Sequence, residues 1–562
     1  MHHHLSLRHK LIIMLSVMAS LFLVALDQTI VATALGRIVE DFNAFDSLSW
    51  IVTAYLLTTT VTVPIAGKLS DLFGRRVMLL IGVAVFGAGS LMSGLAADIN
   101  QLVVWRAFQG IGGGIITANA FTIIGDLFAA RERGRWQGIF GAVFGLSSII
   151  GPLLGGWLAD GQQLFGLTTD WRWTFTINVP IALVAFAVIA VFCPPLRHAK
   201  KPRVDYLGAA LLTIALATLV LAVDNTEAIF ADVMQATGLS LVGLRMLMGL
   251  IVVGATIAFV TVQRRTPEPI LPLSLFSNRT FVLLMGVATM FGTGFIGSIL
   301  YLTQFNQQVF GATPTESGLM LLPMVAGIMV ASIGSGQIIA RTGRYKAFMQ
   351  FGIVLATAMV ALLATLTPES SYLYEAAVIT LLGLGLGFVM PVMNIAVQNE
   401  VEQKHLGIAT SSVQLFRGLG STVGIALFGA MLTMGIATQL REIELNPYVR
   451  QLEDSSVATR IGSLNDPNTL LTLNTNDVRT QVGVEYEASA KRIPAELRPA
   501  ARQEFMSNQV EYSNVVAQAF SDSLRGIFIT SAALMLLASV LVFFIQEREL
   551  KKARPEATPG EI

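Results

Sequence analysis

Residues 65–80 read IAGKLSDLFGRRVMLL, and this stretch decides the fold. A short charged segment lies here between two long apolar runs, which predicts a turn between two helices at a membrane surface. Gly67 and Gly74 are expected to permit such a tight turn. The basic character of cytoplasmic loops explains the cations, but it does not explain the spacing G-x-L-x-D-x-x-G-R-R. We expect a gating hinge here, formed by Gly67, Asp71, Gly74, Arg75 and Arg76.

The composition places the chain in a membrane. Of its 562 residues, 54% are hydrophobic and 13% are charged, and the mean hydropathy is +0.66. A soluble domain carries about 25% charged residues. The charges gather between about fourteen apolar blocks of roughly 20 residues, each long enough to cross the hydrocarbon core. We therefore predict an all-α polytopic membrane protein with about 14 transmembrane helices.

Signatures of enzymes, cofactors and metal sites are absent from the sequence. No G-x-x-x-x-G-K-[ST] motif is present, so ATP hydrolysis by a P-loop is not expected. The glycine run from Gly110 to Gly114 lies inside an apolar span, where close helix packing explains it better. Three of the six histidines stand at the extreme N-terminus, and the net charge of +1 gives no indication of nucleic-acid binding. We expect no enzymatic activity, no cofactor and no bound metal.

The charges of successive loops alternate along the chain. Lys and Arg mark the cytoplasmic side of a membrane protein, so the alternation places both termini in the cytoplasm. The basic loops contain Arg8, Lys10, Lys68, Arg75, Arg76, Arg131, Arg133, Arg135, Arg197, Lys200, Lys201, Arg203, Arg264, Arg265, Arg341, Arg344, Lys346, Lys551, Lys552 and Arg554. The intervening short loops contain Asp98, Asp160, Asp170, Asp224, Glu227, Asp232, Glu369 and Glu375.

The first hinge is repeated later in the chain. The segment from Gly336 to Lys346 keeps the spacing of the two glycines and the arginine, but Ala340 stands where the first copy has Asp71. The copies follow the second and tenth spans, which two related six-helix halves with two inserted helices would explain. We predict an N-terminal bundle in residues 1–200, linker helices in 201–266 and a C-terminal bundle in 267–562. The unequal copies predict unequal roles in gating.

Several motifs resemble those of the major facilitator superfamily, and in particular its fourteen-span drug:proton antiporters, a family of multidrug efflux transporters. The hinge resembles the loop between helices 2 and 3 of that superfamily. Three further stretches match in the same order: Leu26-Asp27-Gln-Thr-Ile-Val, Arg106-x-x-Gln109-Gly110, and Trp171-Arg-Trp to Asn178-x-Pro180. In the fifth span, Gly151, Pro152, Gly155 and Gly156 resemble the antiporter motif, although generic small-residue packing is an alternative.

The resemblance implies a secondary transporter that exports amphipathic or cationic drugs in exchange for protons, with no cofactor other than the coupling proton. It implies a bacterial cytoplasmic (inner) membrane protein and a contribution to antibiotic resistance. A lipid or siderophore exporter of the same fold is an alternative. A non-transporting scaffold or sensor is another, and it would not need a titratable carboxyl inside the membrane. We expect a monomer in the lipid bilayer.

The charged and polar residues inside the spans are the candidates for chemistry. An isolated carboxylate is costly in hydrocarbon, so Asp27 is expected to face an aqueous path or a cation and to carry the coupling proton. Arg106 could pair with a carboxylate or extend toward the interface. Arg417 could bind substrate, form an ion pair or reach the inner surface. The remaining candidates for a substrate cavity are Gln304, Asn306, Asn394 and Gln398.

The segment 437–517, between the last two spans, is expected to lie outside the cytoplasm. It is too long for a turn and too poor in apolar residues for an independent core, although 496–514 is expected to be helical. Related fourteen-span proteins often carry a hairpin at this place. The segment could guide substrates or bind a periplasmic adaptor or another envelope partner. Disorder and a structural cap are the alternatives.

Overall fold

The computed structural model describes residues 6–42, 48–159, 163–164, 166–193, 204–223, 226–312, 314–402, 405–444, 447–453, 473–474, 476–489, 494 and 496–550. Almost all of these residues are helical. The short hairpin of β1 (Gln163–Leu164) and β2 (Leu167–Thr168) pairs antiparallel, with Gln163 opposite Thr168.

The helices of the first group follow the apolar runs of the N-terminal part. They are α1 (Leu7–Phe42), α2 (Leu48–Phe73), α3 (Arg75–Gly94), α4 (Ile99–Leu127), α5 (Ala130–Ala159), α6 (Trp173–Thr176) and α7 (Asn178–Phe192). Side-chain capping sets where α4 begins, because Asp98 accepts a hydrogen bond from the amide of Gln101 at 2.9 Å. The middle of the chain forms α8 (Tyr206–Val223), α9 (Thr226–Ile229), α10 (Ala231–Thr237) and α11 (Leu241–Arg265).

The second group begins after the 3₁₀ helix η2 (Leu273–Ser277). Its helices are α12 (Arg279–Gln308), α13 (Pro314–Met320), α14 (Leu322–Thr342), α15 (Lys346–Leu363), α16 (Tyr372–Glu400), α17 (Leu406–Glu444), α18 (Pro447–Glu453), α21 (Asn476–Ser489) and α22 (Arg498–Phe543). Asn278 caps α12 by accepting from the amides of Thr280 and Phe281.

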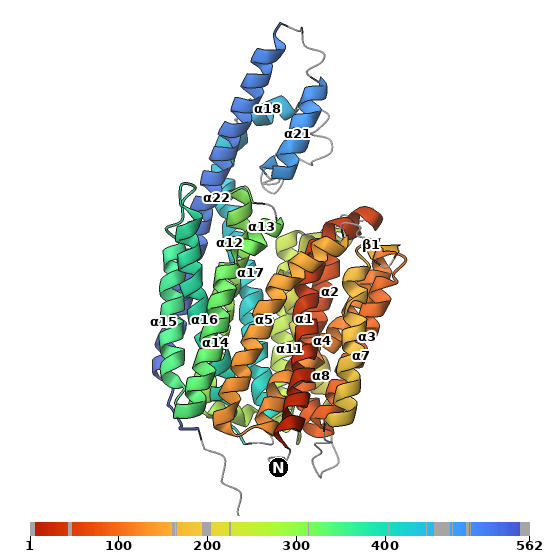
Figure 1. The fold of residues 1–562 in the computed structure, drawn as a ribbon, viewed down its shortest axis with the longest axis vertical. Helices are drawn as coiled ribbons and strands as arrows, with labels where there is room; N and C mark the ends of the chain where they lie inside the picture. The colour runs from red at the N-terminus through yellow and green to blue at the C-terminus, as the bar shows by residue number, and fades with distance from the viewer. Residues whose placement is uncertain are drawn as a thin grey trace, which may run out of the picture.

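The prediction of an all-helical membrane protein is confirmed. Among the described residues, thirteen helices are long and apolar enough to cross a membrane. The 30-residue helix α5 occupies the position of the other span that we expected, and it packs against α1 and α14. The two groups stand side by side in Figure 1, with the N-terminus at the end opposite the protruding α18 and α21.

The helices pack mainly within their own group. In the first group, α4 packs on α2 and α3, while α1 packs on α5 and α7; in the second, α12 packs on α17 and α22, and α16 on α14 and α15. The groups are joined chiefly by α5 with α14 and α2 with α17, and also by α5 with α16 and α4 with α17. The helices α8 and α11 pack on each other, and α8 also touches α2 and α17. The domain boundaries at 200 and 266 stay a prediction.

The hinge positions require glycine for different structural reasons. Gly74 has a φ of 94° at the turn between α2 and α3, and Gly343 has a φ of 74° after α14, a conformation that favours glycine. Gly67 lies inside α2 rather than in the turn, so our assignment of Gly67 to the turn is wrong. A Cβ atom on Gly67 would lie 2.3 Å from Ser411 Oγ of α17. Close approach between the two groups therefore explains Gly67.

The segment 437–517 contains a packed core, so the expectation that it is too poor in apolar residues is wrong. Tyr448, Val482, Phe505 and Tyr512 belong to one buried cluster that α18, α21 and α22 share. The rings of Tyr486 and Phe505 stack with centroids 3.8 Å apart. The helix expected in 496–514 forms the start of α22, which continues without a break into the last span. Figure 1 shows this hairpin standing beyond the end of the bundle.

Candidate functional site

Asp27 and Arg106 form an ion pair inside the first group. Arg106 Nη1 lies 2.6 Å from Asp27 Oδ2, and the exposed fractions of the two residues are 1% and 0%. Arg106 also donates to the carbonyl of Ile51 at 3.3 Å, and its guanidinium lies 4.3 Å from the ring centroid of Tyr55. The arginine therefore does not extend toward the interface. Its charge is balanced by the carboxylate and by the face of an aromatic ring.

Two amides complete the surroundings of the Asp27 carboxylate. Gln109 Nε2 donates to Asp27 Oδ1 at 2.8 Å, and Asn178 Nδ2 donates to the same oxygen at 3.2 Å. Both amides also donate to Ser90 Oγ, at 3.2 and 3.1 Å, and Ser90 donates to the carbonyl of Phe175. The carboxylate is thus held by donors from α4 and α7, an arrangement that suits its ionised form.

The motifs quoted from the sequence explain part of this cluster. The spacing of Arg106 and Gln109 places both on one face of α4, and Asn178 begins α7. Ser90 and Tyr55 were missed, since a lone serine or tyrosine in an apolar span gives no signal of its own. Whether Asp27 and Arg106 couple protons to transport stays a prediction.

An ion-paired loop fixes the start of α6 and α7 at the end of the bundle opposite the N-terminus. Trp171 Nε1 donates to Asp41 Oδ2 at 3.0 Å, and Arg172 Nη1 lies 3.1 Å from the same oxygen. The Trp171 hydrogen bond, together with the charge of Arg172, holds the pKa of Asp41 below its ordinary value. The loop thereby positions Asn178 next to Asp27.

Of the glycines in the fifth-span motif, Gly151 packs α5 against α1. A Cβ on Gly151 would lie 1.9 Å from Thr29 Oγ1 of α1, so this glycine permits a close approach beside Asp27. A Cβ on Gly156 would meet nothing within 4 Å. Gly155 is buried in the same helix. Pro152 lies within α5, but its side chain is outside the described residues.

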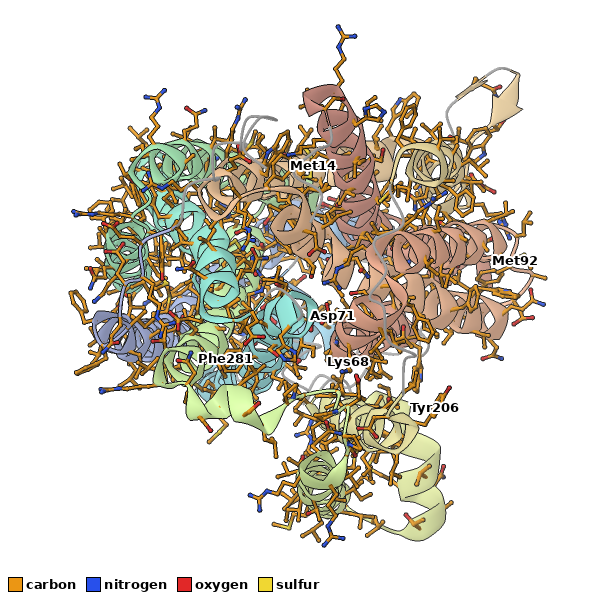
Figure 2. The ribbon with its side chains drawn as sticks, turned by 90° about the horizontal axis from the view of Figure 1, so that it is seen from below. Met14, Lys68, Asp71, Met92, Tyr206 and Phe281 are labelled. Atoms are coloured by element: carbon orange, nitrogen blue, oxygen red, sulfur yellow. The ribbon has the colours of Figure 1, made fainter. Side chains whose placement is uncertain are left out.

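Asp71 links the two groups at the end of the bundle that carries the basic loops, which we call the basic end. Its oxygens accept from the amides of Gly407 and Ile408 at 3.2 and 3.1 Å, and these amides lie in the first turn of α17. Arg75 bonds to Asp71 and lies 2.8 Å from Asp126 of α4. Figure 2 shows Lys68 and Asp71 at the junction of the groups. The partially positive start of α17 thus faces a carboxylate of the other group.

The other hinge arginine and the lysine form separate contacts. Arg76 donates to the carbonyl of Ala190 in α7, and Lys68 Nζ lies 3.1 Å from Glu268, just after α11. The second copy of the hinge contacts a carboxylate from the end of the chain, since the amides of Tyr345 and Lys346 donate to Glu547 Oε1 at 2.9 and 3.1 Å. A Cβ on Gly336 would lie 2.3 Å from the carbonyl of Gly134 in α5, and Arg131 of α5 donates to the carbonyl of Arg341 at 3.5 Å.

The candidates for a substrate cavity do not form one cluster. Gln398 bridges the groups near the basic end, where it donates to the carbonyl of Phe121 at 3.1 Å and accepts from Gln137 at 3.2 Å. Asn394 is buried one turn before Gln398 in α16. Gln304 and Asn306 lie near the far end of α12, and Arg417 lies in the first third of α17. Their roles in binding stay predictions.

Fold and site together define a multi-pass helical transporter with a buried ion pair. Residues 17–425 match the family model of the Major Facilitator Superfamily, so the chain belongs to this superfamily and is not an enzyme. It is 33% identical to Multidrug transporter protein MdtP of Bacillus subtilis over 96% of this chain and 93% of the relative. It is 30% identical to Multidrug resistance protein 3 of Bacillus subtilis over 96% of both chains. The crystal structure of a bacterial homologue of the human lysosomal transporter Spinster shares the fold, with a TM-score of 0.54 and 16% identity over 97% of this chain and 100% of that one.

The close approach at Gly67 leads to a first prediction. Gly67→Ala should slow transport about tenfold, because overpacking costs about 1–3 kcal/mol in the state in which α2 touches α17. Transport by the reconstituted variant measures the effect. Gly334→Ala on α14 is the control, since its Cβ would meet nothing within 4 Å. Equal rates for both variants would show that contact at Gly67 does not limit the cycle.

Proposed function

We propose that this protein is a proton-coupled antiporter that exports amphipathic or cationic compounds across the bacterial cytoplasmic membrane. It acts as a monomer with both termini in the cytoplasm. The multidrug transporters that it resembles along nearly its whole length support export. The observation that carries proton coupling is the buried Asp27, held by Arg106 and two amides within a membrane-spanning helix.

Protonation of Asp27 would change the balance of charge in this cluster. A neutral carboxyl cannot form the ion pair with Arg106, and a buried unpaired arginine is costly. The cost favours a rearrangement of α1 and α4 that gives Arg106 another partner or water. Because α1 packs on α5, and α5 packs on α14 of the other group, such a rearrangement reaches the junction of the groups. This route would link proton binding to alternating access.

The basic end is closed in this structure, which corresponds to one of the two states that alternating access requires. Hydrogen bonds between the groups lie at Asp71, Arg131, Gln137 and Gln398, all toward the basic end. Separation of α2 from α17 and of α5 from α14 would open it. Asp71 and the hinge would then stabilise the state that is closed to the cytoplasm.

Flux through proteoliposomes tests the proposal. Purified protein is reconstituted, a pH gradient is imposed, and transport of cationic, neutral amphipathic and lipid compounds is measured together with proton movement. We expect transport of amphipathic compounds that stops when a protonophore collapses the gradient. Transport of lipid alone would favour a lipid exporter, and absence of any flux would favour a scaffold or sensor.

The hairpin beyond the bundle gives a second prediction. Replacement of residues 455–490 by a short Gly/Ser linker removes α21 and exposes the core that Tyr448 and Phe505 share. Transport of some substrates should fall severalfold while the protein still reaches the membrane, because the packed hairpin continues directly into the last span. Loss of export in cells with full activity in liposomes would indicate that the hairpin binds a partner. Unchanged activity in both settings would contradict both roles.

A further inference from the structure

Arg417 lies at about mid-membrane depth. It follows the first residue of α17, Leu406, by eleven positions, which at 1.5 Å per residue places it about 16 Å from the basic end. The hydrocarbon core is about 30 Å thick, so an arginine at this depth is too far from either surface to reach water simply by extending. The side chain is half-buried.

The contacts of α17 show which way Arg417 faces. Gly420 and Gly424 pack on α12, Gly407 and Ser411 pack on α2, and Leu415 and Leu419 pack on the side of α8. Thr410, Gln414 and Arg417 follow one another at intervals of four and three residues, so they share the remaining face of α17. Thr410 on this face bonds to Gln398, which also reaches Phe121 of the first group. Arg417 and Gln414 therefore face the interior between the two groups.

Arg417 and Gln414 together present only hydrogen-bond donors. Arg417 Nη2 donates to Gln414 Oε1, and because arginine cannot accept, this contact fixes the orientation of the amide. Gln414 is 7% exposed, and its Nε2 has no hydrogen-bond partner among the described residues. A guanidinium and a free amide N–H₂ side by side match an oxygen ligand with negative charge.

The carboxylates named here lie elsewhere in the bundle. Asp27 is paired with Arg106, Asp71 is paired with Arg75, and Glu375 lies in the first turn of α16 at the opposite end of the bundle from Asp71. Among the described residues no ion pair involves Arg417. A cation kept in the interior without a counter-charge is costly unless a ligand supplies one.

We propose that Arg417 and Gln414 bind an anionic group, such as a carboxylate, of the transported compound. The inference rests on the proposed export function and narrows its substrates: amphipathic compounds with an anionic group, including zwitterions, are preferred over compounds that are only cationic. Arg417 supplies the charge, and Gln414 supplies a second donor that orients the ligand oxygen.

Equilibrium binding without a pH gradient tests this proposal. The full chain is placed in phosphatidylcholine nanodiscs and titrated with a dansyl-labelled alkyl chain that ends in a carboxylate, a primary amide or an ammonium group. The carboxylate probe should bind about tenfold more tightly than the ammonium probe, the ratio that one charge-assisted hydrogen bond implies. Arg417→Gln should lose about the same factor for the carboxylate probe while leaving the amide probe unchanged.

Two further variants separate recognition from folding. Gln414→Glu places a carboxylate beside Arg417, so the fold keeps a satisfied arginine while the anionic probe loses about tenfold in affinity. Arg245→Gln is the matched control, since Arg245 is exposed on α11. Phosphatidylglycerol in place of phosphatidylcholine shows whether a lipid headgroup competes for the same donors, in which case the natural anion is a lipid.

Equal binding of the ammonium and carboxylate probes would overturn the proposal, as would unchanged carboxylate affinity in both Arg417→Gln and Gln414→Glu. The measured affinities do not depend on proton coupling, because no pH gradient is applied. Anion binding in a protein whose flux ignores the pH gradient would contradict the antiport mechanism but keep this site.

Discussion

Asp27→Asn is expected to abolish export driven by a pH gradient, lowering the rate at least about 100-fold to the background of empty liposomes. The variant has no carboxyl to carry the proton, and it leaves Arg106 buried without a counter-charge. Removal of one partner of a buried pair costs about 3–5 kcal/mol, so the protein should also become less stable. Transport in proteoliposomes and thermal unfolding in detergent measure the two effects.

The double variant Asp27→Asn with Arg106→Gln separates coupling from stability. It removes both charges, so much of the lost stability should return while export stays absent. Asp27→Glu keeps a carboxyl at a different reach, and it should retain partial export with a shifted pH optimum. Export by the double variant at the rate of the unmodified protein would remove Asp27 from the coupling mechanism.

Asp71→Asn is expected to open the basic end. The substitution removes the charge that faces the first turn of α17 and one of the two carboxylates that pair with Arg75. Hydrogen bonds to charged groups contribute about 1.5–3 kcal/mol, so the ratio of open to closed protein should rise about 10- to 100-fold. A cysteine replacing the buried Thr410, in a background with the native Cys193 replaced by alanine, should then react faster with a water-soluble maleimide.

Asp126→Asn is the matched control for this experiment. Asp126 also pairs with Arg75, through Arg75 Nε at 2.8 Å, but it lies on α4 within the same group as the hinge. Of the two substitutions, only Asp71→Asn should raise the rate at which the cysteine of Thr410→Cys reacts with the maleimide. Equal labelling in both variants would mean that Asp71 serves Arg75 locally and does not hold the groups together.

Much of the fold was predictable because membrane insertion is a simple constraint. A helix is the spanning structure that satisfies its own backbone hydrogen bonds, so long apolar runs predict helices almost directly. The hairpin beyond the bundle was harder to predict. Its core draws Tyr448, Val482 and Phe505 from three separate helices, and such sparse apolar residues give no continuous periodic signal.

The sequence by itself determined the class, the spans and the hinge turn at Gly74, because hydropathy and a positive φ depend on local chemistry. It also placed Asp27 and Arg106 inside the membrane. Only the tertiary structure decided that these two residues pair with each other, and that Gly67 and Asp71 contact α17, more than 300 positions along the chain. Contacts between helices depend on how their faces meet, and the order of residues within one helix leaves that open. Arg417 shows the same limit, since the interior position of the face that it shares with Gln414 follows from the packing of α17 against α2 and α12.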